Sequence, residues 1–131
     1  MNNKFEKHYS LEEARALLPQ IRKWLKDLLD LRSGLEQQEK RLAGLMAPGC
    51  DIGGPLVNKW VRTIAEIKDR LMEFHSREIQ IKDLDRGLID FPAFVGGKEV
   101  FLCWEQGEED IEFWHDLETG YAGREPLSGM E

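Results

Sequence analysis

The feature that most constrains the fold is a run of apolar residues at seven-residue spacing in the first third of the chain. One row consists of Ala14, Ile21, Leu28, Leu35 and Leu42, and a row three residues later consists of Leu17, Trp24, Leu31, Gln38 and Leu45. Two such rows form one face of an α-helix. The pattern predicts a helix over residues 10–46, which is long for a globular domain and closer to a coiled-coil arm.

The start of this helix carries its own signal. Ser10 can accept a hydrogen bond from the free amides of the first turn, and Glu13 stands three residues later, which completes a capping box. Pro19 falls inside the pattern. It either kinks the first turns or marks a later true start of the helix.

A second helix is predicted over residues 55–84, after a segment rich in Gly and Pro from Met46 to Pro55 that reads as a turn. Its apolar seam consists of Val57, Trp60, Ile64, Ile67, Leu71, Phe74, Glu78 and Ile81. The two seams have similar lengths, so we expect an antiparallel helical hairpin. Glu78 is a charge on an apolar seam. Either the helix reaches solvent there, or the carboxylate is aimed at the sheet that follows.

The apolar stripes are wider than one partner helix can cover. The residues that widen them are Leu18, Leu25, Met46 and Ala65. We therefore expect the hairpin to pack against a second copy, which gives a homodimer through the long helices. The alternative is that the sheet covers this surface and the protein is a monomer.

The period of the apolar pattern changes from about 3.5 to 2 in the β-region, residues 87–125. Gly96-Gly97 separates two apolar runs and predicts a two-residue hairpin loop. This loop pairs Val95 with Lys98, Ala93 with Val100, Phe91 with Leu102, Ile89 with Trp104, Phe94 with Glu99, Pro92 with Phe101, Asp90 with Cys103, and Leu88 with Glu105. The first four pairs are nearly all apolar and should face the helices, whereas the last four form a mixed face.

Two features of the β-region concern its extent. Pro92 cannot donate to a ladder, so we expect its strand to lie at an edge of the sheet. Residues 111–117 can be a strand or a helix, and their aromatic content and the short preceding loop favour a third strand. The predicted fold is α+β, a single domain over residues 1–131 with a long antiparallel helical hairpin followed by a small antiparallel two- to three-stranded β-meander.

Charge and composition limit the classes of function. The net charge is −7, and residues 85–131 hold 3 of the 18 Lys and Arg but 12 of the 25 Asp and Glu. No basic stripe suits a nucleic acid. We find no signal peptide and no apolar run of membrane-spanning length, and we expect Cys50 and Cys103 to stay reduced in a cytoplasmic protein. The acidic half is either a solvated surface or a surface for a cation or an unidentified basic protein partner.

The mixed face of the hairpin brings ligand-type residues together. Asp90 faces Cys103, Glu105 follows on the same face, and His115 and Glu108 can join from the next strand or loop. Cys, His and carboxylates are the ligands of zinc and related divalent metals. The spacing matches neither C-x-x-C nor H-E-x-x-H. No organic cofactor is expected, and the alternative to a metal site is that these side chains hold the sheet and its loops together by hydrogen bonds.

Catalytic interpretations of the same residues are weaker. Cys103 could act as a nucleophile with His115 as its base, although a strand-borne Cys is more often packed as a small hydrophobe. Asp90 with Glu105 or Glu108 could form a general acid–base pair, but no sugar-sized cleft is indicated. Arg124 is expected to pair with a carboxylate of the acidic half, such as Asp90, Glu105 or Asp116, and the alternative is that it binds an anion.

Several strings resemble a known family. They are Phe5 through Ala14, Leu17-Leu-Pro19, Lys82-Asp83, Gly87-Leu-Ile-Asp-Phe-Pro92, Leu102-Cys-Trp-x-x-Gly-Glu108, Trp114-His115 and Gly120-x-x-Gly-Arg124. Together they resemble the bacterial domain-of-unknown-function family 2203 over nearly the whole chain. The resemblance implies a small cytoplasmic protein and supplies no activity. The leading hypothesis is a noncatalytic oligomeric interaction or structural module. The alternative is a divalent-metal-binding protein with a site on the sheet, which could be a hydrolase.

Overall fold

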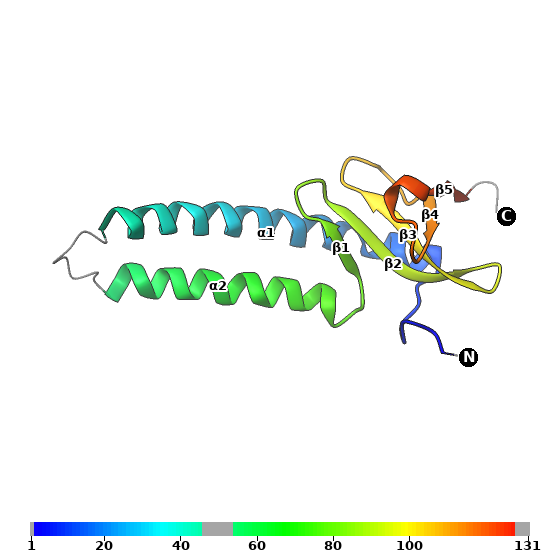
Figure 1. Ribbon diagram of the computed structural model, residues 1–131, viewed down its shortest axis with the longest axis horizontal. Coiled ribbons are helices and arrows are strands. Elements are labelled where there is room, and N and C mark those ends of the chain that lie inside the picture. The colour runs from blue at the N-terminus through cyan, green and yellow to red at the C-terminus, as the bar shows by residue number, and fades with distance from the viewer. Residues whose placement is uncertain (1, 46–53, 128–131) are drawn as a thin grey trace.

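Two long helices lead into an antiparallel sheet at one end of the molecule (Figure 1). The computed structural model describes residues 2–45 and 54–127. Within these residues, no helix has both the length and the apolar character needed to span a bilayer. The two helices and the sheet confirm the predicted α+β fold and the helical hairpin. The segment predicted to be the turn lies almost entirely outside the described residues.

The first helix, α1, spans Leu11–Leu45, as its heptad pattern predicts. The capping box is present. The amide of Glu13 donates to Ser10 Oγ at 3.0 Å, and the amide of Ser10 donates to Glu13 Oε1 at 2.9 Å. Pro19 lies inside α1, so the alternative of a later start is wrong.

The second helix, α2, spans Gly54–His75, so the prediction that it continues to residue 84 is wrong. Glu78 ends it by adopting a positive φ of 58°, at the position that glycine usually takes in a Schellman motif. The amide of Ile79 donates to Phe74 O at 3.1 Å, and the amide of Glu78 donates to His75 O at 3.0 Å. The side chains of Phe74 and Ile79 are both buried. A glutamate at this position gives no stop signal in the sequence.

The sheet has five strands rather than two or three. They are β1 (Gln80–Asp83), β2 (Leu88–Val95), β3 (Lys98–Glu105), β4 (Phe113–Asp116) and β5 (Glu125–Pro126), and a short 3-10 helix, η1 (Tyr121–Gly123), precedes the last strand. The strands pair in chain order as an antiparallel meander. All eight β2–β3 pairs predicted from the Gly96-Gly97 loop are present. Residues 113–116 form a strand, as their aromatic content favours.

The prediction that β2 is an edge strand is wrong, because β1 pairs with it on the other side from β3. The β1 pairing reaches only Asp90. Pro92 lies beyond it, and its carbonyl accepts a hydrogen bond of 2.7 Å from the amide of Tyr9. The backbone nitrogen of Pro92 therefore lies on the side of β2 where β1 has already ended. Because no strand pairs there, the missing N–H removes no hydrogen bond from the sheet.

The main core lies between the sheet and the first half of α1. The sheet contributes Ile89, Phe91, Ala93, Val100, Leu102 and Trp104, and α1 contributes Ala14, Leu18, Ile21, Trp24, Leu25 and Leu28. This confirms the predicted core face. Leu18 and Leu25 were expected to widen a surface for a second copy, but both are buried within the chain, in the core cluster that includes the sheet residues. Among fully buried residues, α2 contributes only Phe74.

The N-terminal segment crosses the opposite face of the sheet. Glu99 accepts hydrogen bonds from the amides of Lys4 at 2.8 Å and Phe5 at 3.0 Å and from His8 Nε2 at 2.7 Å. Glu78 accepts from the next two amides, those of residues 6 and 7, at 3.0 and 2.7 Å. Two carboxylates thus hold this segment in place, and the Phe5 ring packs against Phe101 with centroids 5.4 Å apart.

Candidate functional site

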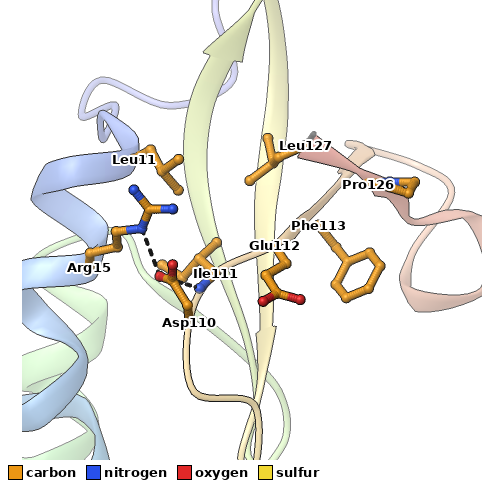
Figure 2. Close-up of a pocket in the computed structure, with 8 residues that line it drawn as sticks. All are labelled: Leu11, Arg15, Asp110, Ile111, Glu112, Phe113, Pro126 and Leu127. Atoms are coloured by element: carbon orange, nitrogen blue, oxygen red, sulfur yellow. Dashed lines mark hydrogen bonds and ion pairs between the residues drawn. The ribbon is translucent and has the colours of Figure 1, made fainter. Parts of the chain in front are cut away.

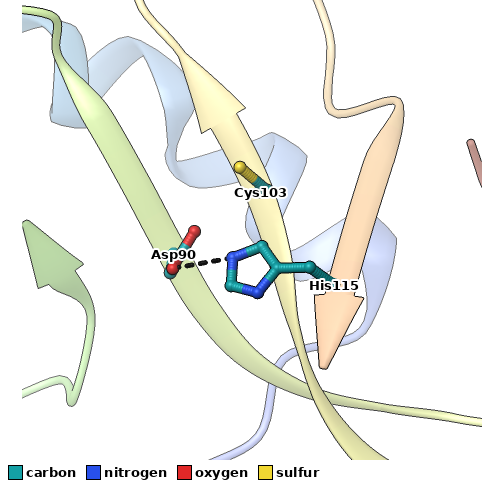
Figure 3. Close-up of side chains that lie close together, drawn as sticks. All are labelled: Asp90, Cys103 and His115. Atoms are coloured by element: carbon teal, nitrogen blue, oxygen red, sulfur yellow. Dashed lines mark hydrogen bonds and ion pairs between the residues drawn. The ribbon is translucent and has the colours of Figure 1, made fainter. Parts of the chain in front are cut away.

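Three ligand-type side chains converge on the face of the sheet that points away from the helices. Asp90 comes from β2, Cys103 from β3 and His115 from β4 (Figure 3). The register explains why they meet. Asp90 is paired with Cys103, and His115 is paired with Phe101, two residues along the same face of β3. All three are at most 1% exposed.

Both ring nitrogens of His115 have acceptors as partners. Nδ1 donates to the carbonyl of Asp116 at 2.7 Å, and Nε2 donates to Asp90 Oδ2 at 2.9 Å. Burial alone lowers the pKa of His115. The hydrogen bonds to Asp90, Cys103 and the Asp116 carbonyl, together with the Asp90 charge, outweigh it and raise the pKa to about 10. The raised pKa favours a protonated His115, which pairs with the buried carboxylate of Asp90 at 2.9 Å.

The pair between His115 and Asp90 leaves one carboxylate oxygen and one thiol of the cluster available to a ligand. Asp90 Oδ1 is buried and has no hydrogen-bond partner. Cys103 is a free, buried thiol. One ligand atom from each of Asp90, Cys103 and His115 lies within 4.8 Å of the other two. Buried polar atoms are rarely left unpaired in native proteins, so the bare carboxylate oxygen needs an explanation.

The other two predicted ligands are held by arginines beside this cluster. Glu105 pairs with Arg86 Nε at 2.7 Å, and this bond lowers the pKa of the glutamate. Glu108 takes a two-pronged pair from Arg124, with separations of 3.2 and 2.8 Å. The partner of Arg124 is thus Glu108 and not one of the three carboxylates proposed from the sequence. Both glutamates are engaged as structural ion pairs.

Arg124 closes one side of the cluster. Its guanidinium lies 3.9 Å from the Phe113 ring centroid and 4.2 Å from that of Tyr121, so both rings pack against it. Its Nη1 approaches Cys103 Sγ at 3.9 Å. The sequence offers a signal for this arrangement only in the scarcity of basic residues in the acidic half.

This geometry does not support the catalytic interpretations. A thiol nucleophile needs a free base nitrogen, but both nitrogens of His115 already donate to oxygen acceptors, and Cys103 is 0% exposed. An acid–base pair needs a second carboxyl group that is free to exchange protons with a substrate. Glu105 and Glu108 are instead bound to arginines.

A depression of about 410 Å³ lies elsewhere, between the start of α1, the segment before β4, and β5 (Figure 2). Its wall carries an ion pair, because Arg15 Nε donates to Asp110 Oδ1 at 2.7 Å. The same carboxylate oxygen accepts the amide of Ile111 at 2.7 Å. The pair ties α1 to the loop before β4, so these polar groups serve the fold.

A second candidate surface lies along α2. Four large apolar side chains there are exposed: Val61 at 52%, Ile64 at 40%, Leu71 at 43% and Met72 at 48%. We refer to these four residues as the α2 stripe. Ile64 and Leu71 stand on the predicted seam, but Val61 and Met72 were missed. The missed signal is the row Val61, Ala65, Lys68 and Met72, whose spacings of four, three and four are typical of one helix face.

Comparison with known proteins gives one match. A family model described as "Uncharacterized conserved protein (DUF2203)" matches residues 7–127. No curated protein and no solved structure matches the chain.

Proposed function

The chain belongs to the DUF2203 family, whose description specifies no activity. From the geometry we propose that the protein is a noncatalytic module that forms a homodimer through α2. The observation that carries the proposal is the α2 stripe, since four half-exposed large apolar side chains share one side of this helix. Monomeric proteins rarely expose contiguous apolar patches of this kind without a binding role.

The periodicity of α2 supports a helix as the partner of this surface. Val57, Val61, Ile64, Lys68, Leu71 and His75 are separated by four, three, four, three and four residues. This is the a and d spacing of a helix–helix seam. A different row consists of Trp60, Ile67 and Phe74, each one residue before an a position of this seam. These side chains are half-buried or buried, unlike those of the α2 stripe. The helix therefore carries a second seam beside the buried row.

The second seam is self-complementary in antiparallel order. A twofold axis at residue 66 sets Val61 against Leu71 of the second copy, and Ile64 against Lys68 of the second copy. It also sets Val57 against the His75 of the second copy. Parallel order would instead place the two Lys68 ammonium groups in the same layer, which is unfavourable. The proposed dimer is thus antiparallel and isologous.

Analytical ultracentrifugation tests this proposal. We expect the wild-type chain to sediment as a dimer at concentrations down to about 1 μM, which is the range of a moderate interface. Ile64→Glu combined with Leu71→Glu should give a folded monomer, because both side chains are already about 40% exposed. Leu45→Glu is the matched control, since this leucine is 44% exposed and lies on α1, outside the proposed dimer seam of α2. A wild-type monomer at all concentrations would contradict the proposal.

The compartment and a further partner are also part of the proposal. The buried free thiol of Cys103 supports a reducing, cytoplasmic location. Exposed carboxylates at Glu109, Glu112, Glu118 and Glu125 form the part of the acidic half available to a basic protein partner. Other carboxylates of this half are paired with basic residues, as Asp110 is with Arg15 and Glu99 with His8.

A further inference from the structure

We propose that Asp90, Cys103 and His115 form a buried structural site for one divalent transition-metal ion of the zinc class, independent of the proposed dimer. The three residues come from three adjacent strands, and one ligand atom of each lies within 4.8 Å of the others. Tetrahedral zinc ligands at 2.0–2.3 Å from the ion lie roughly 3.3–3.8 Å apart. Small side-chain rotations therefore suffice to close the set around an ion.

The histidine is oriented as a zinc-binding histidine usually is. Its Nδ1 donates to the backbone carbonyl of Asp116 at 2.7 Å, which fixes the ring and leaves Nε2 directed at the other two ligands. Such a hydrogen bond from the far ring nitrogen to a carbonyl is the common support of metal-ligating histidines.

The unpaired carboxylate oxygen of Asp90 also indicates a missing ligand, independently of the spacing of the three side chains. Asp90 Oδ1 is buried without a hydrogen-bond partner, although Oδ2 has one. An ion between the three residues can take one or both carboxylate oxygens. The pair Oδ1 and Oδ2, with Cys103 Sγ and His115 Nε2, supplies four donor atoms from three side chains. The ion thus gives the bare oxygen the partner that the protein does not.

The charge balance of the site also fits a divalent ion. With metal bound, the Asp90 carboxylate and the Cys103 thiolate offset its two positive charges, and His115 is neutral. The bound form therefore leaves no net charge in the interior.

The ligand types and the burial select the metal class and the role. A thiolate, an imidazole and a carboxylate in a closed site suit zinc and its cobalt substitute, whereas magnesium and calcium prefer oxygen ligands alone. Asp90 and His115 are 1% exposed and Cys103 is 0% exposed. An ion held there joins β2, β3 and β4 and is shielded from solvent, as structural zinc sites are.

Cobalt titration of a Cys50→Ala variant tests the proposal directly. Cys50 is the only other cysteine of the chain, so a thiolate-to-cobalt charge-transfer band in the near ultraviolet can then arise only from Cys103. We expect this band to saturate at one ion per chain, with the visible absorption of tetrahedral cobalt, and to disappear when zinc is added. This experiment leaves the sheet unaltered.

Further variants separate the site from adventitious binding. His115→Gln should weaken zinc binding by at least about tenfold. His75→Asn is the matched control, because this histidine is exposed at the end of α2 and should leave the affinity unchanged. Absence of the charge-transfer band in folded Cys50→Ala protein would overturn the proposal. Zinc affinity that falls in His75→Asn as much as in His115→Gln would overturn it too.

Discussion

Of the two carboxylates that hold the N-terminal segment, Glu99 accepts three hydrogen bonds, and the removal of its charge should be measurable. The substitution Glu99→Gln keeps the shape of the side chain but removes its charge and one acceptor. Three hydrogen bonds are affected, from the amides of Lys4 and Phe5 and from His8 Nε2. Bonds to a charged partner contribute roughly 1.5–3 kcal/mol each. One amide oxygen remains, so we expect a local loss of about 2 kcal/mol.

Residue-resolved hydrogen exchange is the appropriate assay, because the segment can open locally without global unfolding. A loss of about 2 kcal/mol corresponds to roughly 30-fold faster exchange. We expect this at the amides of Lys4 and Phe5. The following amides, of Glu6 and Lys7, should change much less because Glu78 still binds them. Glu118→Gln removes the same charge from an exposed position and serves as the control variant.

The same carboxylate gives a dependence on pH. Burial raises the pKa of Glu99, but the bonds from His8, Lys4 and Phe5 outweigh it and bring the pKa below the ordinary value of 4.5. A depressed pKa contributes stability above the unfolded pKa, and this contribution is lost as the pH falls through the folded value. The gap between wild type and Glu99→Gln should thus be full at pH 7 and close in acid. Unchanged exchange at Phe5, or a gap that persists in acid, would refute the reasoning.

Three further outcomes follow from the sheet, one of its turns and α1. Asp90→Asn, measured by urea unfolding with chelator present, should lose roughly 3–5 kcal/mol, because it leaves His115 without its buried partner; a loss below 1 kcal/mol would contradict the buried pair. Gly87→Ala should cost about 2 kcal/mol or more, since φ is +64° and the new Cβ would meet Gln106 Cβ at 2.6 Å. Gly44→Ala, by contrast, should stabilise the protein by about 1 kcal/mol in urea or thermal unfolding, because its helix site is open.

Local patterns predicted the parts of the fold in which neighbouring residues decide the conformation. The heptad rows and the Ser10–Glu13 capping box placed α1 to within a residue at each end. The Gly96-Gly97 loop gave the complete β2–β3 register. These succeeded because a two-residue loop fixes which residues face each other, and the period of 2 then assigns every side chain to a face.

The candidate site was predictable for the same reason, but only in part. The register placed Asp90 opposite Cys103, and the strand assignment of residues 113–116 brings His115 to the same face. The register could not separate these ligands from Glu105 and Glu108. The separation depends on Arg86 and Arg124, which approach from a turn and from the chain end.

The sequence by itself therefore determined the helices, the hairpin and the two faces of the sheet, because periodicity, capping and turn chemistry act over a few residues. The tertiary structure decided where α2 ends, since a glutamate takes the left-handed position that the Phe74–Ile79 contact stabilises. It also decided that Leu18 and Leu25 of α1 are buried in the core of the same chain, while the chain itself leaves the α2 stripe uncovered. Such choices depend on which surfaces meet across the chain, and no local pattern encodes that competition.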